Sequence, residues 1–140
     1  MERFDCFFSI VYATLDIRTG HLVYSNAGHM PPLILGCSGN LEILKHHGPV
    51  IGTGLGSPFG QKEQKLSQGD RFILYTDGLI ENFGKDGESI GKDLFFKTLN
   101  ELHRQPIKHM VDGVFNRSSK LRGETPLTDD MSLLAIEYKA

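Results

Sequence analysis

The chain is 140 residues long and carries a formal net charge of −2 at neutral pH. With 39% hydrophobic and 23% charged residues, its composition is that of a globular domain and excludes a disordered or fibrous chain. A chain of this length can bury about two thirds of the surface that its unfolded form exposes, which is enough for a cooperative core. The slightly acidic balance, without a stripe of Lys and Arg, argues against nucleic acid as a partner.

No segment of the chain predicts a membrane span or a secretory signal. A transmembrane helix needs about 20 consecutive apolar residues. The longest apolar runs here, such as residues 7–13 and 31–35, contain polar residues or end within a few positions. The N-terminus lacks the positive segment and apolar stretch of a signal peptide. We therefore expect a cytoplasmic protein.

The first third of the chain predicts two β-hairpins. Residues 6–16 are rich in β-branched and aromatic side chains, and residues 21–27 resume the strand pattern after the turn-forming residues 18–20. A pair of prolines then excludes a helix. Two short apolar runs, residues 33–36 and 41–44, flank a second turn and predict the second hairpin.

The next segment, residues 48–60, contains five glycines and two prolines. We expect a surface loop without regular structure, because that many glycines leave the backbone free. The spacing Gly52-x-Gly54-x-Gly56 matches neither GxGxxG nor GxxxxGK[ST], and no helical pattern follows it. It therefore argues against a nucleotide-binding loop, since no helix N-terminus would receive the phosphate.

Two helices are predicted in the second half of the chain. Apolar residues recur at steps of three and four over residues 92–103, which is typical of one helical face. Pro106 is expected as the first residue of a second amphipathic helix. Residues 120–128 are expected to form a polar loop.

Acidic residues lie at the ends of two predicted strands. Residues 71–77, RFILYTD, predict a strand that ends at Asp77, and residues 131–138 predict a final strand directly after Asp129 and Asp130. If these strands are antiparallel neighbours, the carboxylates lie at one sheet edge. Such oxygen ligands suit Mg²⁺ or Mn²⁺. An Asp before Gly is also an ordinary turn residue, so the spacing alone leaves both interpretations open.

Three segments together resemble a known family: residues 26–35, NAGHMPPLIL, residues 69–82, GDRFILYTDGLIEN, and residues 128–136, TDDMSLLAI. In this order and context they are similar to the sporulation-protein-E-type branch of the PPM (protein phosphatase 2C-like) family. The resemblance extends from about Phe8 to the C-terminus. It implies an α+β fold, a sandwich of antiparallel β-sheets flanked by helices. It also implies a binuclear Mn²⁺ or Mg²⁺ site, where a metal-bound water hydrolyses phosphoserine or phosphothreonine.

The resemblance assigns roles to individual residues. Asp77 and Asp129 match metal ligands, and Asp130 stands where relatives place Asp or Asn beside the ligand. Gly78 is expected to keep the turn after Asp77 tight. The resemblance implies no catalytic side chain, because the family's chemistry uses a metal-bound water.

Three further positions have two interpretations each. His29 belongs to the family signature, but a lone imidazole beside Gly and Pro is expected rather to brace the turn. Glu81 either orients the metal turn through a hydrogen bond or is an exposed residue at the start of a helix. His46 and His47 are adjacent, so on a strand they point to opposite faces and do not predict a metal site.

The chain departs from the family pattern at its N-terminus. Family members carry an N-terminal sheet portion with an acidic residue and an Asp-Gly metal motif, and neither Asp5 nor Asp16 has that context. We therefore expect residues 1–140 to form a single domain that is the C-terminal portion of a phosphatase domain. Such a piece is expected to bind metal weakly and to show little or no activity unless the remaining part is supplied.

Two hypotheses about function follow. The first is a piece of a bacterial signalling phosphatase whose substrate is a phosphorylated regulator of the anti-anti-sigma type. The second is a non-catalytic interaction or dimerisation domain derived from the same fold. A homodimer is a further hypothesis, since uncovered strand edges are usually paired.

Overall fold

The computed structural model describes residues 6–54, 58–83 and 88–140. The described part is an α+β fold, as predicted, and contains these strands and helices in chain order: β1 (Ile10–Asp16), β2 (His21–Ala27), β3 (Leu33–Leu35), β4 (Leu41–Ile43), β5 (Lys62–Lys65), β6 (Arg71–Tyr75), α1 (Asp77–Phe83), α2 (Glu88–Leu102), α3 (Ile107–Arg122) and β7 (Leu133–Glu137).

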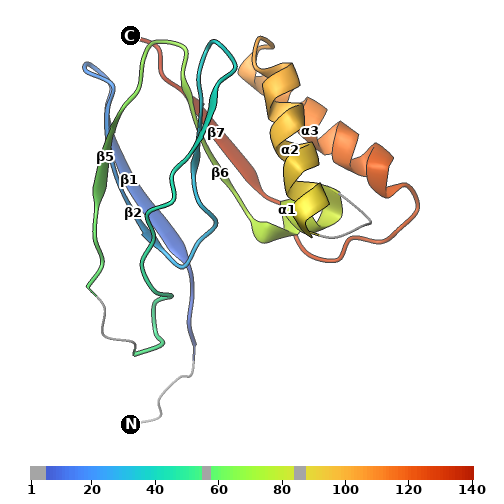
Figure 1. The fold of residues 1–140 in the computed structure, drawn as a ribbon, viewed down its shortest axis with the longest axis horizontal. Coiled ribbons are helices and arrows are strands. Elements are labelled where there is room, and N and C mark those ends of the chain that lie inside the picture. The colour runs from blue at the N-terminus through green and yellow to red at the C-terminus, as the bar shows by residue number, and fades with distance from the viewer. Residues whose placement is uncertain (1–5, 55–57, 84–87) are drawn as a thin grey trace.

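The elements form three layers (Figure 1). One antiparallel sheet has the strand order β1-β2-β5, and the other has the order β4-β3-β6-β7. Helices α2 and α3 cover the face of the second sheet that points away from the first, while α1 lies at the end of β6. This arrangement confirms the predicted sandwich of antiparallel sheets with helices packed beside it.

Two hydrophobic clusters hold the layers together. The larger one lies between the second sheet and the helices, and its buried members are Leu33, Leu35, Ile73, Tyr75, Leu79, Ile80, Phe83, Phe95, Leu99, Met110 and Val114. The smaller one lies between the two sheets and consists of Leu22, Tyr24, Ile34, Leu44, Leu66, Phe72 and Tyr138. Strand β6 contributes to both clusters because alternate side chains point to opposite faces of the sheet.

Both predicted hairpins are confirmed. Strand β1 pairs with β2 up to the pair Asp16 and His21, and the Asp16 carbonyl accepts a hydrogen bond from the Gly20 amide at 2.8 Å. Gly20 adopts a φ of +73°, which side chains with a Cβ rarely adopt. The second hairpin, β3 and β4, closes with a hydrogen bond of 2.8 Å from the Gly36 amide to the Asn40 carbonyl.

Strand β5 (Lys62–Lys65) is absent from the sequence-based prediction. Its sequence, KEQK, is entirely polar, and no residue of it is buried. It forms because it adds to the free edge of β2, with the pairs His21 and Lys65 through Tyr24 and Lys62. In the described parts of the glycine-rich segment, residues 48–54 and 58–60, only isolated bridges occur, so the predicted loop is confirmed there.

The helical half differs from the prediction at three boundaries. Asp77 begins the short helix α1, whereas the sequence predicted a tight turn there. Pro106 is the N-cap of α3 and not its first helical residue. Helix α3 continues to Arg122, so the predicted polar loop begins only after it. None of the helices found in the described residues is both long and apolar enough to cross a membrane.

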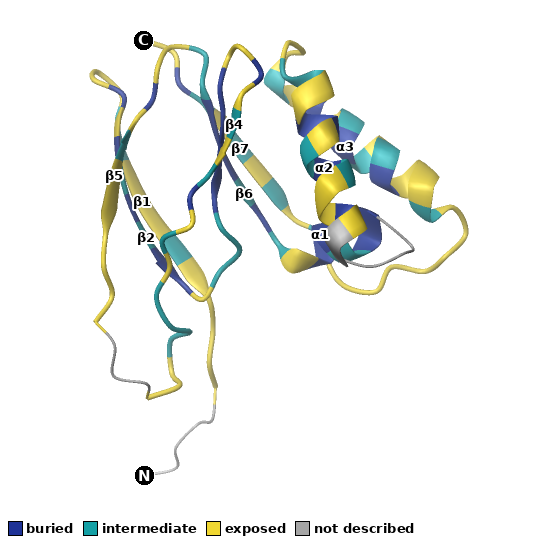
Figure 2. Cartoon of the chain, viewed as in Figure 1, coloured by how far each residue is buried: buried dark blue, intermediate teal, exposed yellow. Residues whose placement is uncertain are grey.

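The sandwich is open along the side formed by β1 and β7, which are edge strands (Figure 2). On β7, Leu133 and Ala135 pack against the helical cluster. Leu134 and Ile136 point to the opposite face and are 55% and 42% exposed. The neighbouring strand β6 is buried on that same face by the first sheet, which does not extend over β7. Two apolar side chains of β7, Leu134 and Ile136, are therefore left uncovered at this edge.

Candidate metal centre

Strands β6 and β7 bring the two acidic segments together, as the antiparallel prediction required. Their last paired residues are Tyr75 and Leu133. Beyond this pair, the Thr76 amide donates to the Ser132 carbonyl at 3.1 Å, and the Ser132 amide donates to the Thr76 hydroxyl at 3.0 Å. The two segments therefore remain side by side up to Asp77.

Gly78 allows the closest approach of the two segments. A Cβ at this position would lie 2.1 Å from the Asp130 carbonyl oxygen and 3.2 Å from the Asp129 Cβ. The first distance is too short for any side chain, so the backbone of Asp130 occupies the space that a larger residue would need. The φ of Gly78 is not positive. Its role is this close approach, and the prediction that it forms a tight turn is wrong.

The acidic side chains are exposed at this junction. One carboxylate oxygen of Asp77 accepts a hydrogen bond from the Gly78 amide at 3.0 Å. One carboxylate oxygen of Asp129 accepts from the Asp130 amide at 2.7 Å. Within the described residues the second oxygen of each carboxylate makes no hydrogen bond, so it is free to bind a cation.

The carboxylates at this junction are ligands of the type that a hard divalent cation prefers, but the described residues bring too few of them together for a complete site. Carboxylate oxygens are the ligands that Mg²⁺ and Mn²⁺ prefer. Within residues 6–54, 58–83 and 88–140, however, no group of three or more His, Cys, Asp or Glu side chains is placed to hold a metal. At the junction itself, the described residues place the exposed carboxylates of Asp77, Asp129 and Asp130.

His29 lies beside this junction. It lines a cavity of about 150 Å³ together with Asp77, Thr76 and Ser9, and its Nδ1 lies 3.2 Å from the Ser9 hydroxyl. Among the described residues, the imidazole makes no hydrogen bond to the backbone of its own turn. Asn26 braces this turn, because its Oδ1 accepts from the His29 amide at 2.9 Å and its Nδ2 donates to the His29 carbonyl at 3.0 Å.

Glu81 and its neighbour Asn82 have different surroundings. Glu81 is half-buried in α1, and no described residue forms a hydrogen bond with its carboxylate. Asn82 is 5% exposed, and its amide bonds backbone groups of both acidic segments. Sequence reasoning missed Asn82. The available signal was its place at the end of residues 69–82, one of the segments that resemble the family.

Tyr75 ends β6 next to the acidic junction and belongs to the core. Its ring contacts that of Phe95, with ring centroids 5.1 Å apart. Burial raises the pKa of the Tyr75 phenol to about 12. The phenol therefore stays neutral in the physiological range and does not add negative charge to the site.

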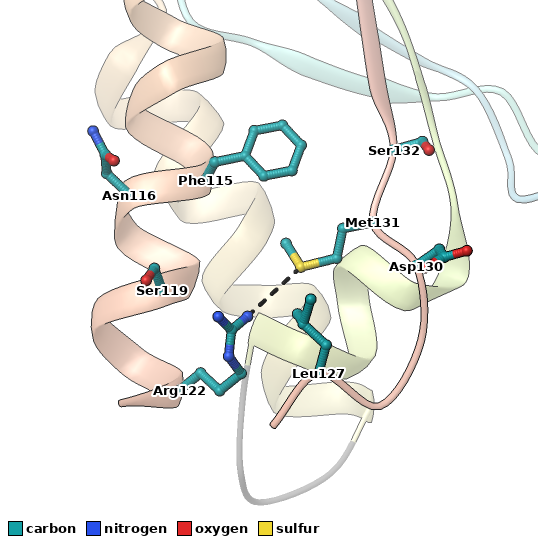
Figure 3. A pocket seen from close by; sticks show the side chains of 8 residues that line it. All are labelled: Phe115, Asn116, Ser119, Arg122, Leu127, Asp130, Met131 and Ser132. Atoms are coloured by element: carbon teal, nitrogen blue, oxygen red, sulfur yellow. Dashed lines mark hydrogen bonds between the residues drawn. The ribbon is translucent and has the colours of Figure 1, made fainter. Parts of the chain in front are cut away.

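A larger groove runs between α3 and the segment that leads into β7 (Figure 3). Its volume is about 660 Å³, and it is lined by Phe115, Asn116, Ser119, Arg122, Leu127, Asp130, Met131 and Ser132. The Arg122 guanidinium lies 3.9 Å from the Met131 sulfur. Figure 3 shows the Asp130 carboxylate pointing away from Arg122. The groove therefore opens beside the acidic junction and has Asp130 in common with it, whereas Asp77 and Asp129 do not line it.

Several known proteins are similar to this chain in sequence or in fold. The family model described as Stage II sporulation protein E (SpoIIE) matches residues 2–139. The phosphoserine phosphatase RsbU of Bacillus subtilis is 27% identical over 134 residues, which are 95% of this chain and 39% of RsbU. The SiaA-PP2C domain of Pseudomonas aeruginosa has a TM-score of 0.81 at 23% identity, over 94% of this chain and 52% of that chain.

A third similar protein is the phosphatase domain of SpoIIE from Bacillus subtilis, in a structure presoaked with Mn. It has a TM-score of 0.74 at 14% identity, over 94% of this chain and 56% of that chain. This chain thus spans about two fifths of RsbU and about half of each of the two solved chains. The two structural likenesses show the fold, and the fold is that of the PP2C-type phosphatase domains. Because the family model covers nearly the whole sequence, the chain belongs to the SpoIIE family of PPM phosphatases.

Proposed function

We propose that this chain is the part of a metal-dependent serine/threonine protein phosphatase that supplies Asp77 and Asp129 as metal ligands. Asp130 and Gly78 support these ligands. The observation that carries the proposal is the contact between the two acidic segments, where a Cβ on Gly78 would lie 3.2 Å from the Asp129 Cβ. A family model for a phosphatase domain over residues 2–139 adds independent support.

The proposed reaction converts phosphoserine or phosphothreonine to the free hydroxyl and inorganic phosphate. Bound Mn²⁺ or Mg²⁺ would supply a water of lowered pKa and positive charge for the phosphate oxygens. The residues of this chain hold the cation through the free carboxylate oxygens at the end of β6 and before β7. A complete binuclear site also requires carboxylates beyond those of the described residues, so we expect weak metal binding and little turnover by this chain on its own.

The substrate that we propose is a phosphorylated bacterial signalling regulator, of the anti-anti-sigma type. The similarity to RsbU, a phosphoserine phosphatase, supports this choice. Such a phosphatase would act in the cytoplasm, where its substrate would be phosphorylated. His29 and Glu81 stand beside the proposed centre as supporting residues, His29 because it lines the same cavity as Asp77.

A second function, as an interaction or dimerisation domain, is favoured by one observation. The open side of the sandwich exposes Leu134 and Ile136, which a partner or a second copy of the chain would bury. The two functions predict different effects of Asp77→Asn. This substitution abolishes metal-dependent hydrolysis under the first function and leaves partner affinity nearly unchanged under the second.

Phosphate release from a phosphoserine peptide tests the enzymatic function. The purified chain is assayed with and without Mn²⁺, beside Asp77→Asn and a control, Asp112→Asn, which changes an exposed acidic residue of α3 that pairs with Lys108. Any release is expected to require Mn²⁺, to persist in the control and to disappear in Asp77→Asn. Release that continues in Asp77→Asn, or without metal, contradicts the proposal.

A further inference from the structure

Asn82 connects the two acidic segments through one side-chain amide. Its Nδ2 donates to the carbonyl oxygens of Gly78 at 2.6 Å and Asp129 at 3.2 Å. Its Oδ1 accepts a hydrogen bond from the Thr128 amide at 3.0 Å. The same side-chain amide therefore contacts the helix that begins with Asp77 and the backbone of both Thr128 and Asp129.

The amide is buried and fully paired. Asn82 is 5% exposed, and both of its amide hydrogens and its oxygen have partners. The Thr128 hydroxyl also lies 3.4 Å from Oδ1. A buried amide that satisfies every donor is held in one orientation, because any rotation leaves polar groups unpaired. The network thus fixes a distance between two chain segments that are far apart in sequence.

Asn82 is the principal restraint on the residues just before Asp130. The ladder between β6 and β7 ends at the pair Tyr75 and Leu133. The Thr76 hydroxyl then contacts the Asp130 carbonyl at 3.3 Å. For the Thr128 amide and the Asp129 carbonyl, Asn82 is the only hydrogen-bond partner among the described residues.

We propose that Asn82 is a positioning residue for the metal centre, which holds Asp129 against the helix that begins with Asp77. This inference rests on the proposed function, since it assigns Asn82 a role in metal binding. Asn82 itself acts through the backbone and does not bind the cation. Groups that orient metal ligands in this way typically change metal affinity or activity about 10- to 100-fold when they are lost.

Ser118 provides a matched control. Its hydroxyl is fully buried and donates to the backbone carbonyl of Asn82 at 3.2 Å, which joins α1 to α3. Ser118→Ala therefore removes one hydrogen bond at the same residue and leaves the amide contacts with Thr128 and Asp129 in place. A merely structural role for Asn82 predicts similar effects of the two substitutions.

The experiment compares the wild-type chain with Asn82→Ala, Asn82→Ser and Ser118→Ala. A serine at position 82 can still bond the carbonyl four residues earlier within α1, but it cannot reach Thr128. Asn82→Ser therefore provides a second test of the same contacts if Asn82→Ala does not fold. Urea unfolding fixes conditions under which each variant is folded. Amide hydrogen exchange by NMR and the Kd for Mn²⁺ from the electron paramagnetic resonance signal of free Mn²⁺ are then measured.

We expect the Asn82 variants to lose protection of the Thr128 amide while amides within β7 keep theirs. The Kd for Mn²⁺ rises about 10-fold or more. Ser118→Ala lowers the urea midpoint but changes the Kd less than twofold. Folded Asn82 variants that keep the Thr128 protection, or that bind Mn²⁺ as the wild type does, overturn the inference.

The failure of the proposed function gives a different result. If the wild-type chain binds no Mn²⁺ at any accessible concentration, the metal function proposed for this chain is contradicted. Hydrogen exchange at the Thr128 amide then tests, without any metal measurement, whether Asn82 holds this segment. Lost protection in the Asn82 variants supports the positioning contact, and retained protection overturns it.

Discussion

Two buried asparagines, Asn26 and Asn82, hold the loops that carry the candidate site residues. Each is at most 5% exposed. Asn26 bonds backbone groups of its own turn, and Asn82 bonds backbone groups of Thr128 and Asp129 from helix α1. The sequence identified Asp77 and Asp129 because they occupy recognisable segments at strand ends. It did not identify the amides, because Asn is equally common in exposed turns and its burial depends on the tertiary structure.

Arg71 and Glu137 form a second polar contact, away from the acidic junction. The buried Arg71 side chain donates through Nε to Glu137 Oε2 at 2.9 Å and through Nη2 to the Gln105 carbonyl at 2.6 Å. Its Nη2 also forms an ion pair with Glu137 Oε2, at 2.9 Å. Burial opposes ionisation of Glu137, but the hydrogen bond and charge of Arg71 outweigh it, and Lys139 adds to the effect. The pKa of Glu137 therefore lies below its ordinary value of 4.5.

This contact predicts a pH-dependent stability. Because the folded-state pKa of Glu137 is lowered, its carboxylate stabilises the fold above about pH 4.5, and this contribution disappears as the pH falls through the folded-state pKa. Glu137→Gln should lower the free energy of unfolding at pH 7 by about 1 to 3 kcal/mol. Urea unfolding from pH 7 to pH 3 measures both effects. The difference between wild type and variant should shrink with acidification, and a constant difference contradicts this prediction.

At the scale of elements, periodic segments were predicted well and short polar ones were not. Helices α2 and α3 and strand β7 pack one apolar face against the helical cluster, and β6 is a continuous apolar run buried on both faces, which leaves a clear pattern in the sequence. Strand β5 has no such pattern because it is an exposed edge strand. Helix α1 is only seven residues long and contains Gly78, so its residues predicted a turn.

The junction between β6 and α1 predicts a strong effect of Gly78→Ala. The new methyl group would lie 2.1 Å from the Asp130 carbonyl oxygen, so the two acidic segments must move apart. We expect the free energy of unfolding to fall by about 1 to 3 kcal/mol, as for other overpacked sites. The Mn²⁺ affinity should fall as well.

Gly113→Ala is the matched control for that substitution. Its methyl group would meet only the side chain of Leu102, whose nearest terminal methyl lies at 2.7 Å and can rotate away. It also replaces a glycine within helix α3, where alanine is favoured by about 1 kcal/mol. Urea unfolding of both variants is the measurement. Equal destabilisation by the two substitutions would show that the close approach at Gly78 is not special.

At the scale of the whole molecule, the open side of the sandwich distinguishes the chain from a closed β-sandwich. β1 and β7 are both edge strands, and the inward face of β7 remains exposed at Leu134 and Ile136. The sequence predicted an uncovered edge through its resemblance to longer family members. It did not predict which residues are exposed, because alternating apolar residues on β7 are typical of both covered and uncovered strands.

We expect a second copy of the chain to cover this edge at high protein concentration. Leu134→Lys should then shift sedimentation toward the monomer, because a charge at a buried apolar contact is unfavourable. Tyr12→Lys is the control, since Tyr12 is 68% exposed on the outward face of β1. Analytical ultracentrifugation over a concentration series measures the association. A wild-type chain that stays monomeric throughout rules out the dimer.

Calorimetric titration of the purified chain with Mn²⁺, beside Asp77→Asn and Asp129→Asn, tests most directly whether the two acidic segments form one metal site. The proposed site predicts weak but saturable binding by the wild type. It also predicts that each substitution alone removes this binding, because one cation needs both carboxylates. Absent binding by the wild type, or binding that survives either substitution, would contradict the assignment of Asp77 and Asp129 as ligands of a shared metal.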